Sequence, residues 1–94
     1  MIAFDPEKDA ANIAKHGVSL EAAARIGLDD AVVVADVRRD YGEPRWIAYQ
    51  QLDGRVHVLV FTLRDGATRP ISLRKANDRE RRLFESRRSG GSAA

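Results

Sequence analysis

The residues best suited to chemistry are basic side chains around the end of one expected strand and the start of the last expected helix. Arg64 ends a strand, and Arg74 and Lys75 stand where the next strand runs into that helix. Together with Arg69 and Arg81, they are expected to converge on one edge of the domain. Converging guanidinium and ammonium groups bind successive phosphates and stabilise the added negative charge of a phosphoryl-transfer transition state. In the alternative reading, each arginine covers apolar surface with its stem or pairs with a nearby carboxylate.

The two histidines are the other groups that could transfer protons. His57 lies among apolar residues of an expected strand, where a structural histidine is commoner than a catalytic one. His16 lies in the last turn of an expected helix, where a protonated imidazole stabilises the helix dipole. Neither belongs to a metal-binding spacing, and the chain has no cysteine. The sequence therefore predicts neither a metal site nor a cofactor.

The two halves of the chain differ in charge. Residues 1–50 carry six Lys and Arg against nine Asp and Glu, whereas residues 51–94 carry ten against five. A small domain with one acidic and one basic end is typical of proteins that bind an anionic ligand, of which nucleic acid is the commonest. The alternative is a helix whose arginines are simply solvated, and charge alone does not separate the two.

The length of 94 residues indicates one domain, and the balance of 44% hydrophobic and 32% charged residues is that of a folded protein rather than a disordered one. No apolar run approaches the roughly 20 residues that span a bilayer. The first residues lack the basic start and apolar stretch of a signal peptide. We therefore expect a cytoplasmic protein that does not contact a membrane.

The elements that must position these residues begin with two short helices. Residues 2–4 could first form a short edge strand. Asp5 as N-cap, Pro6 at the first helical position and Gly17 as the stop predict the first helix. A second helix is expected over 19–27, and the short link between the two makes a helical hairpin.

Four strands are expected next, over residues 31–37, 45–52, 55–64 and 67–74. The β-branched run at the start of this region is typical of a strand that is buried on both faces. Asp53-Gly54 and Asp65-Gly66 are two-residue hairpin signals. Pro70 cannot donate a hydrogen bond to a neighbouring strand, so it predicts an edge or a bulge.

The last element is a basic helix. Asn77 and Glu80 have the spacing of a capping box, and Leu83 and Phe84 are its expected core residues. The predicted fold class is α+β, with two N-terminal helices, an antiparallel sheet of about four strands and this helix. The domain is expected to cover residues 1–88, followed by a disordered tail over 89–94.

Four segments of the chain, in order, resemble the BrnT family of toxins from type II toxin–antitoxin systems. They are FDPEK…N…KHGVSLEAA at 4–23, DVRRDYGEPR at 36–45, DGRVHVLVFTLR at 53–64 and RPISLRKANDRERRLF at 69–84. Each segment alone is a weak signal, but four in this order, within a chain of this length, make a specific one. The resemblance covers nearly the whole chain, up to its tail.

The resemblance implies a fold similar to that of RelE-type ribonucleases and an endoribonuclease that needs no metal. In this chemistry the ribose 2′-OH attacks the adjacent phosphorus, leaving a cyclic phosphate and a free 5′-OH, and translation stops. It also implies neutralisation by a cognate BrnA-like antitoxin with a ribbon-helix-helix part, through which alone the complex contacts DNA. The RNA substrate is either free or on the ribosome. Arginine and lysine supply most of this chemistry electrostatically.

The resemblance favours two sets of residues. Those expected to carry catalysis are Arg64, Arg74, Lys75 and His57, and those expected to bind RNA are Arg69, Arg81 and His16.

The chain departs from the family pattern at four positions. Phe84 stands where many relatives end the last helix with tyrosine, so a catalytic phenol would be missing here, whereas a packing role would be kept. Phe4 replaces a tryptophan, and Pro70 and Leu73 alter the edge beside Arg74. The alternative function is therefore a nucleic-acid-binding or antitoxin-binding module with weak or no catalysis.

Overall fold

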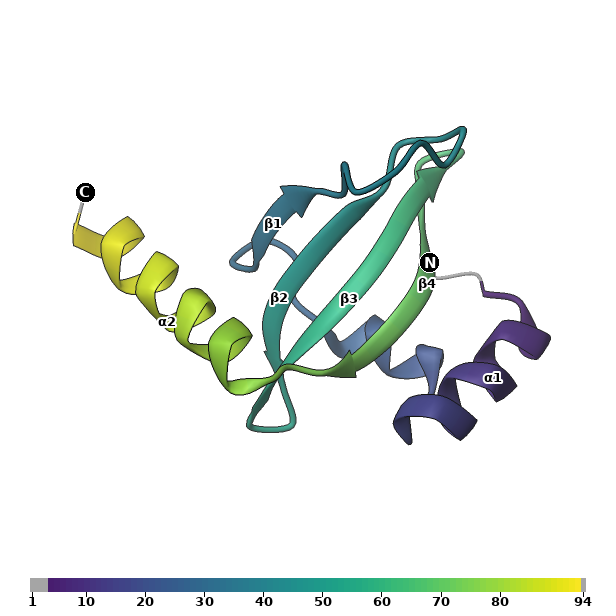
Figure 1. Ribbon diagram of the computed structural model, residues 1–94, viewed down its shortest axis with the longest axis horizontal. Helices are drawn as coiled ribbons and strands as arrows, with labels where there is room; N and C mark the ends of the chain where they lie inside the picture. The colour runs from purple at the N-terminus through teal and green to yellow at the C-terminus, as the bar shows by residue number, and fades with distance from the viewer. Residues whose placement is uncertain (1–3, 94) are drawn as a thin grey trace.

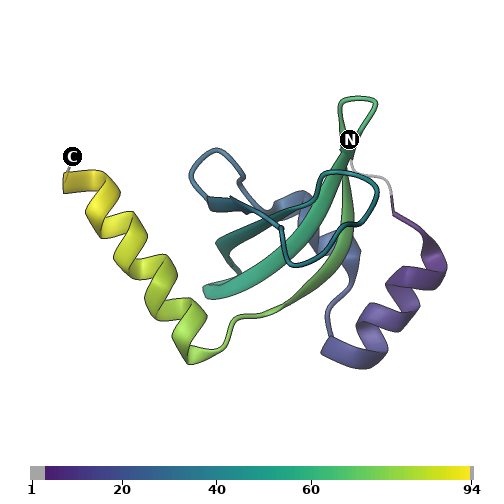
Figure 2. The same cartoon turned by 45° about the horizontal axis from the view of Figure 1, so that its top comes forward.

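The computed structural model describes residues 4–93, with side chains described as far as residue 88. In chain order its elements are α1 (Pro6–His16), the 3₁₀ helix η1 (Leu20–Arg25), β1 (Val32–Ala35), β2 (Trp46–Leu52), β3 (Arg55–Arg64), β4 (Ala67–Lys75) and α2 (Asp78–Ala93). The strands form one antiparallel sheet in the order β1-β2-β3-β4 (Figure 1). The predicted α+β class, with a four-stranded antiparallel sheet and a C-terminal helix, is confirmed. Figures 1 and 2 place α1 and α2 on opposite sides of the sheet.

The N-terminal segment forms one α-helix and one 3₁₀ helix. Asp5 caps α1 by accepting a hydrogen bond from the Glu7 N–H at 2.9 Å, and Gly17 ends the helix with a φ of 73°, as predicted. The second predicted helix is shorter than the expected range of 19–27: it is the six-residue η1, which ends at Arg25 with Ile26 as its C-cap. Of the edge strand expected over 2–4, residues 2 and 3 lie outside the described residues, and Phe4 belongs to no strand.

Both predicted hairpins are present. Asp53-Gly54 and Asp65-Gly66 each have two consecutive positive φ angles, which is the geometry of a tight turn that matches strand twist. Pro70 lies in the edge strand β4 opposite Phe61, where the register shifts. The prediction of an edge or bulge at this proline is therefore confirmed.

The first strand differs from the prediction. β1 spans Val32–Ala35 instead of 31–37, and its residues alternate between half-buried and exposed. It is not buried on both faces, because it is an edge strand that pairs only with β2. The β-branched run indicates a strand, but it does not indicate burial, because edge strands and central strands are both rich in β-branched residues.

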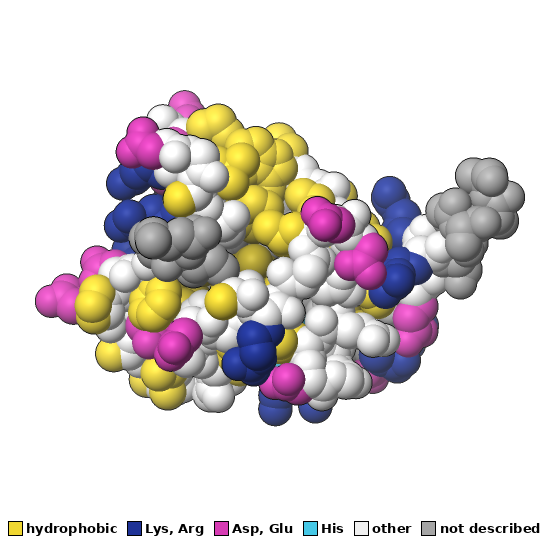
Figure 3. All heavy atoms as spheres, turned by 180° about the vertical axis from the view of Figure 1, so that it is seen from behind, with side chains coloured by type: hydrophobic (Ala, Val, Ile, Leu, Met, Phe, Trp, Pro, Cys, Tyr) yellow, Lys and Arg dark blue, Asp and Glu magenta, His cyan; other side chains and the backbone are white. Residues whose placement is uncertain are grey.

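The core lies between the sheet and the helical segments that precede it. Its buried members are Leu20, Ala22, Ala23, Ile26, Ala48, Leu52, Leu59, Phe61 and Leu73. We call the sheet face that carries this core the helix-side face, and the opposite face, which is turned to the viewer in Figure 1, the front face. Figure 3 views the molecule from behind and shows hydrophobic side chains gathered on its upper part. Val33 and Leu63 belong to the helix-side face by strand alternation and remain 41% and 52% exposed.

The last helix begins with the predicted capping box. The Glu80 N–H donates to Asn77 Oδ1 at 2.8 Å, and the Asn77 N–H donates to Glu80 Oε1 at 3.0 Å. Phe84 is buried, but Leu83 is 42% exposed, so its predicted place in the core is wrong. Neighbouring residues of a helix point about 100° apart, and a narrow contact with the sheet buries only one of them. The helical backbone continues to Ala93, and disorder of the tail in solution stays a prediction.

Candidate nucleic-acid site

Arg74 stands on the front face at the end of the edge strand. Its Nη1 and Nη2 donate to the two carboxylate oxygens of Glu80, both at 2.7 Å. This fork is the main cause that raises the pKa of Arg74 and lowers the pKa of Glu80. Because Glu80 also caps α2, its carboxylate is fully engaged and is unsuited to act as a base. The fork leaves further N–H groups of Arg74 for a ligand, since a guanidinium has five.

A second arginine on this side was not singled out from the sequence. Arg38 donates through Nε and Nη2 to the two oxygens of Asp36, both at 2.7 Å. The Asp36 side chain is 0% exposed, whereas that of Arg38 is 64% exposed. Hydrogen bonding by Arg38 holds the pKa of Asp36 far below its usual range, and Tyr41 adds to this effect. Asp36 therefore stays ionised and holds a guanidinium that has further N–H groups beyond the two in this fork.

The loop that carries Arg38 is stabilised by contacts between its own residues. The Asp36 N–H donates to the Arg45 carbonyl at 2.8 Å, which closes the loop at its base. The Arg45 guanidinium lies 4.1 Å from the centroid of the Tyr41 ring. A guanidinium over an aromatic face is an attractive arrangement, so Arg45 supports the loop rather than the ligand.

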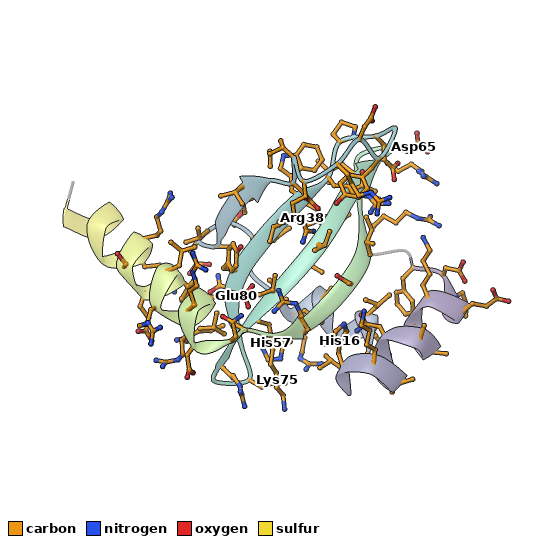
Figure 4. All side chains as sticks on the ribbon, in the orientation of Figure 1. His16, Arg38, His57, Asp65, Lys75 and Glu80 are labelled. Carbon is orange, nitrogen blue, oxygen red and sulfur yellow. The ribbon has the colours of Figure 1, made fainter. Side chains whose placement is uncertain are left out.

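The two arginines act on each other across the front face. The positive charge of Arg38 lowers the pKa of Arg74, although the opposing effect of Glu80 is larger, and Tyr49 also lies within electrostatic range. In Figure 4, Arg38 lies over the front of the sheet and Glu80 lies at the start of α2. We call Arg38, Tyr49 and Arg74 the front-face cluster. Its donors suit the non-bridging oxygens of a phosphodiester, and its phenol ring suits a base.

His16 belongs to the border of this cluster. It lines a shallow pocket with Lys15 and Ser72, where α1 packs against β4. Burial lowers the pKa of His16, and the charges of Lys15 and Arg74 lower it further. The imidazole is therefore neutral at pH 7 and able to accept a proton. Of the residues predicted to bind RNA, His16 is the one that the structure brings towards Arg74.

Arg64 and Arg69 lie elsewhere. Arg64 ends β3 beside the β3–β4 turn and donates to Glu43 at 3.2 Å. Arg74 pairs with Val58, six residues back along β3, which is a separation of about 20 Å at roughly 3.3 Å per residue. Arg69 pairs with Thr62, closer to the turn. The structure therefore does not bring Arg64 and Arg74 to one edge as expected.

Lys75 and His57 are brought together, but on the helix-side face. They are Cα partners in the β3–β4 ladder. Both line a pocket of about 350 Å³ together with Arg25 and Arg55. Figure 4 shows the two side chains near the lower end of the sheet. Because consecutive strand residues point to opposite faces, Lys75 cannot share the site of Arg74.

Arg81 is directed along its own helix. It forms ion pairs with Asp78 at 3.7 Å and with Glu85 at 3.5 Å, and its side chain is 46% exposed. Such pairs hold a side chain only weakly. Within residues 4–88, no group of three or more His, Asp and Glu is placed to hold a metal ion. Across the described backbone, no helix is long and apolar enough to cross a membrane.

The fold and this site define a class of small α+β proteins with a cationic cluster on one face of an antiparallel sheet. Within that class the chain is placed by a family match over residues 4–80, to the ribonuclease toxin BrnT of type II toxin–antitoxin systems. The protein belongs to this family, which confirms the resemblance seen in its sequence. The family is one of ribonuclease toxins with RNA as substrate and an antitoxin as partner. The chain matched none of the curated proteins with which it was compared.

Proposed function

We propose that the protein cuts RNA at the front-face cluster, without a metal, and thereby inhibits translation. One observation carries this proposal: Arg38 and Arg74 are each held by a two-bond carboxylate fork on the sheet face opposite α1 and η1 (Figure 1). Donors that are fixed before the substrate arrives stabilise developing charge without the cost of reorganisation. The family supplies the substrate class, which is RNA.

The proposed reaction is an internal displacement at phosphorus. The ribose 2′-oxygen forms a bond to the adjacent phosphorus and gives up its proton, and the bond from phosphorus to the 5′-oxygen breaks. The leaving oxygen takes up a proton, so the products are a 2′,3′-cyclic phosphate and a free 5′-OH. Arg38 and Arg74 stabilise the charge on the non-bridging oxygens. His16 is the proposed proton acceptor, because its neutral form is present at pH 7.

Phe84 supports this proposal rather than weakening it. The ring is 2% exposed and lies under the Arg88 guanidinium, 5.3 Å from it. This environment is that of a residue that packs in the interior. Phe84 therefore replaces the tyrosine of many relatives at a position that contributes to folding. The absent phenol then costs the reaction little.

The proposed partner is a BrnA-like antitoxin with a ribbon-helix-helix part. By covering the front-face cluster it would exclude RNA, and the complex would contact DNA through the antitoxin. The exposed guanidinium of Arg38 and the apolar Leu83 on α2 offer such a partner both charge and apolar surface. Whether the RNA is cut free or on the ribosome does not alter these contacts.

A second candidate function is binding without cleavage, and the same forks favour it. Asp36 and Glu80 already neutralise the two arginines in the free protein. A neutralised guanidinium still donates hydrogen bonds, but it stabilises an extra negative charge less than a free one does. This protein would then hold RNA or the antitoxin and leave RNA intact.

Induced expression separates the two functions. The wild type is compared with Arg74→Ala and with Arg87→Ala, which removes the same charge from an exposed position on α2. We expect growth arrest and fragmented RNA with the wild type and with Arg87→Ala, and neither with Arg74→Ala. Fragments that carry a 5′-OH support internal attack by the 2′-oxygen. Normal growth with intact RNA in all three strains would refute the ribonuclease proposal for this protein.

A further inference from the structure

The helix-side pocket is not used by the proposed reaction. It lies where the end of α1, η1 and the β2–β3 hairpin meet, and its volume is about 350 Å³. That is the volume of roughly a dozen water molecules at about 30 Å³ each. Arg25, Arg55 and Lys75 line it, with His57 as the most buried polar group. The pocket therefore gathers three cations and one imidazole on the face opposite Arg74.

The position and hydrogen bonding of His57 indicate that the pocket binds a ligand. The residue is 5% exposed, and its Nδ1 lies 2.8 Å from the Arg55 carbonyl oxygen. A carbonyl oxygen only accepts, so Nδ1 carries the hydrogen and Nε2 is the other polar atom of the ring. Within the described side chains, this is the one hydrogen bond found for the ring. An imidazole that lines a pocket and has a nitrogen without a protein partner is suited to bind a group in that pocket.

The charges of the pocket favour an anion. Arg25 is paired with Asp53 at 2.8 Å, at the exposed rim. Arg55 and Lys75 have no ion pair within the part of the chain whose side chains are described, so they leave two positive charges for a ligand. A compact anion with several acceptor oxygens can meet both at once and also reach the imidazole. A phosphate group has this shape and charge.

We propose that this pocket binds a phosphate group, either as inorganic phosphate or at the end of a nucleotide or nucleic-acid strand. A terminal phosphate enters a pocket by one end, whereas an internal phosphodiester must pass through it. The group accepts hydrogen bonds from Lys75 and Arg55, and a phosphate O–H can donate to the unprotonated Nε2 of His57. The inference stands apart from RNA cleavage, because it uses neither Arg38 nor Arg74.

Ring spectra of the two histidines test this site directly. The full-length protein is labelled with ¹⁵N and titrated with inorganic phosphate against sodium chloride of equal ionic strength. The chain has only two histidines, and His16 lies at the border of the front-face cluster, so its signal separately reports phosphate that binds there. We expect the His57 Nε2 signal to move with phosphate and not with chloride. Lys75→Ala should weaken binding about tenfold, whereas Arg87→Ala should not.

The source of the phosphate is decided by oligodeoxynucleotides, which lack the 2′-OH and cannot be cut by the proposed reaction. A 5′-phosphorylated strand that moves the His57 signal, when the 5′-hydroxyl strand of the same sequence does not, assigns a terminal phosphate. A response to inorganic phosphate alone assigns a small ligand. Three results would overturn the site: a His57 signal that does not move with phosphate, a His57 response that persists in Lys75→Ala, or a response to a glutamate-rich peptide but not to phosphate. None of these experiments measures RNA cleavage. Their results would therefore test phosphate binding even if the ribonuclease proposal failed.

Discussion

Replacing Arg38 by alanine is the sharpest test of how the front-face cluster is held. The change removes two charge-assisted hydrogen bonds from a carboxylate that is 0% exposed. Hydrogen bonds to charged groups contribute about 1.5–3 kcal/mol each. The two bonds share one fork, and the guanidinium is 64% exposed, so we take a combined loss of about 2 kcal/mol. For a domain of this size the melting temperature should fall by about 8–16 °C.

The pH dependence of this loss has a definite sign. The pKa of Asp36 is depressed in the folded protein, so its contribution to stability is present above the unfolded pKa of about 3.9. It is lost as the pH falls towards the lower folded value. The difference in melting temperature between wild type and Arg38→Ala should therefore be full at pH 7 and shrink progressively below about pH 4.

Thermal unfolding followed by circular dichroism measures both effects. Asp36→Asn provides the matched background, because it removes the titrating carboxylate and keeps its shape. In that background Arg38→Ala should cost less than about 1 kcal/mol, since the charged fork is already gone. A loss below about 0.5 kcal/mol in the wild-type background at pH 7, or a loss that stays the same at pH 3, would refute the role of the fork.

Three further changes test the neighbouring features. Arg74→Lys keeps the charge but cannot form the two-bond fork with Glu80, so the cleavage rate of a fluorescent RNA should fall at least about tenfold, and an unchanged rate would count against the site. The pKa of His16 is lowered, so cleavage should be fully active at pH 7 and fall as the pH drops below this lowered pKa; His16→Asn should lose that dependence, and an unchanged profile would exclude the imidazole. Asn12 donates to the Leu73 carbonyl at 2.8 Å and accepts from its N–H at 3.2 Å, so Asn12→Ala should lower the free energy of unfolding by about 2 kcal/mol in urea; a change within about 0.5 kcal/mol would show that water replaces the amide.

Local signals in the sequence predicted most of the fold. The caps of α1, the two Asp-Gly turns and the box at Asn77 each depend on a few adjacent residues, so their types carry the information. The position of β1 at the edge of the sheet depends on which strands pair, and a β-branched run is compatible with either position. The length of η1 depends on how its residues pack against the sheet.

The candidate site was less predictable, for two physical reasons. The Asp36–Arg38 fork forms in a loop, where no periodicity indicates which side chains meet, although their spacing of two residues was a signal. The separation of Arg64 from Arg74 could have been derived, because a hairpin closed at Asp65-Gly66 places Arg64 beside the turn and Arg74 towards the open end. Strand alternation likewise required Arg74 and Lys75 to leave opposite faces. The basic residues were grouped by sequence position, whereas strand geometry divides them.

The separation of the basic residues onto different faces and ends of the sheet changes how the charge difference between the two halves of the chain is interpreted. Ten basic residues against five acidic ones in the second half of the chain suggested a strongly cationic end. In the structure Arg64, Arg74 and Arg81 are each paired with a carboxylate, so their charges are largely offset before RNA arrives. Binding of RNA then releases fewer counterions than a count of arginines implies, and its salt dependence should be correspondingly shallow. The front-face cluster therefore acts through oriented N–H donors more than through net charge, which is the property that a transition state with defined oxygen positions requires.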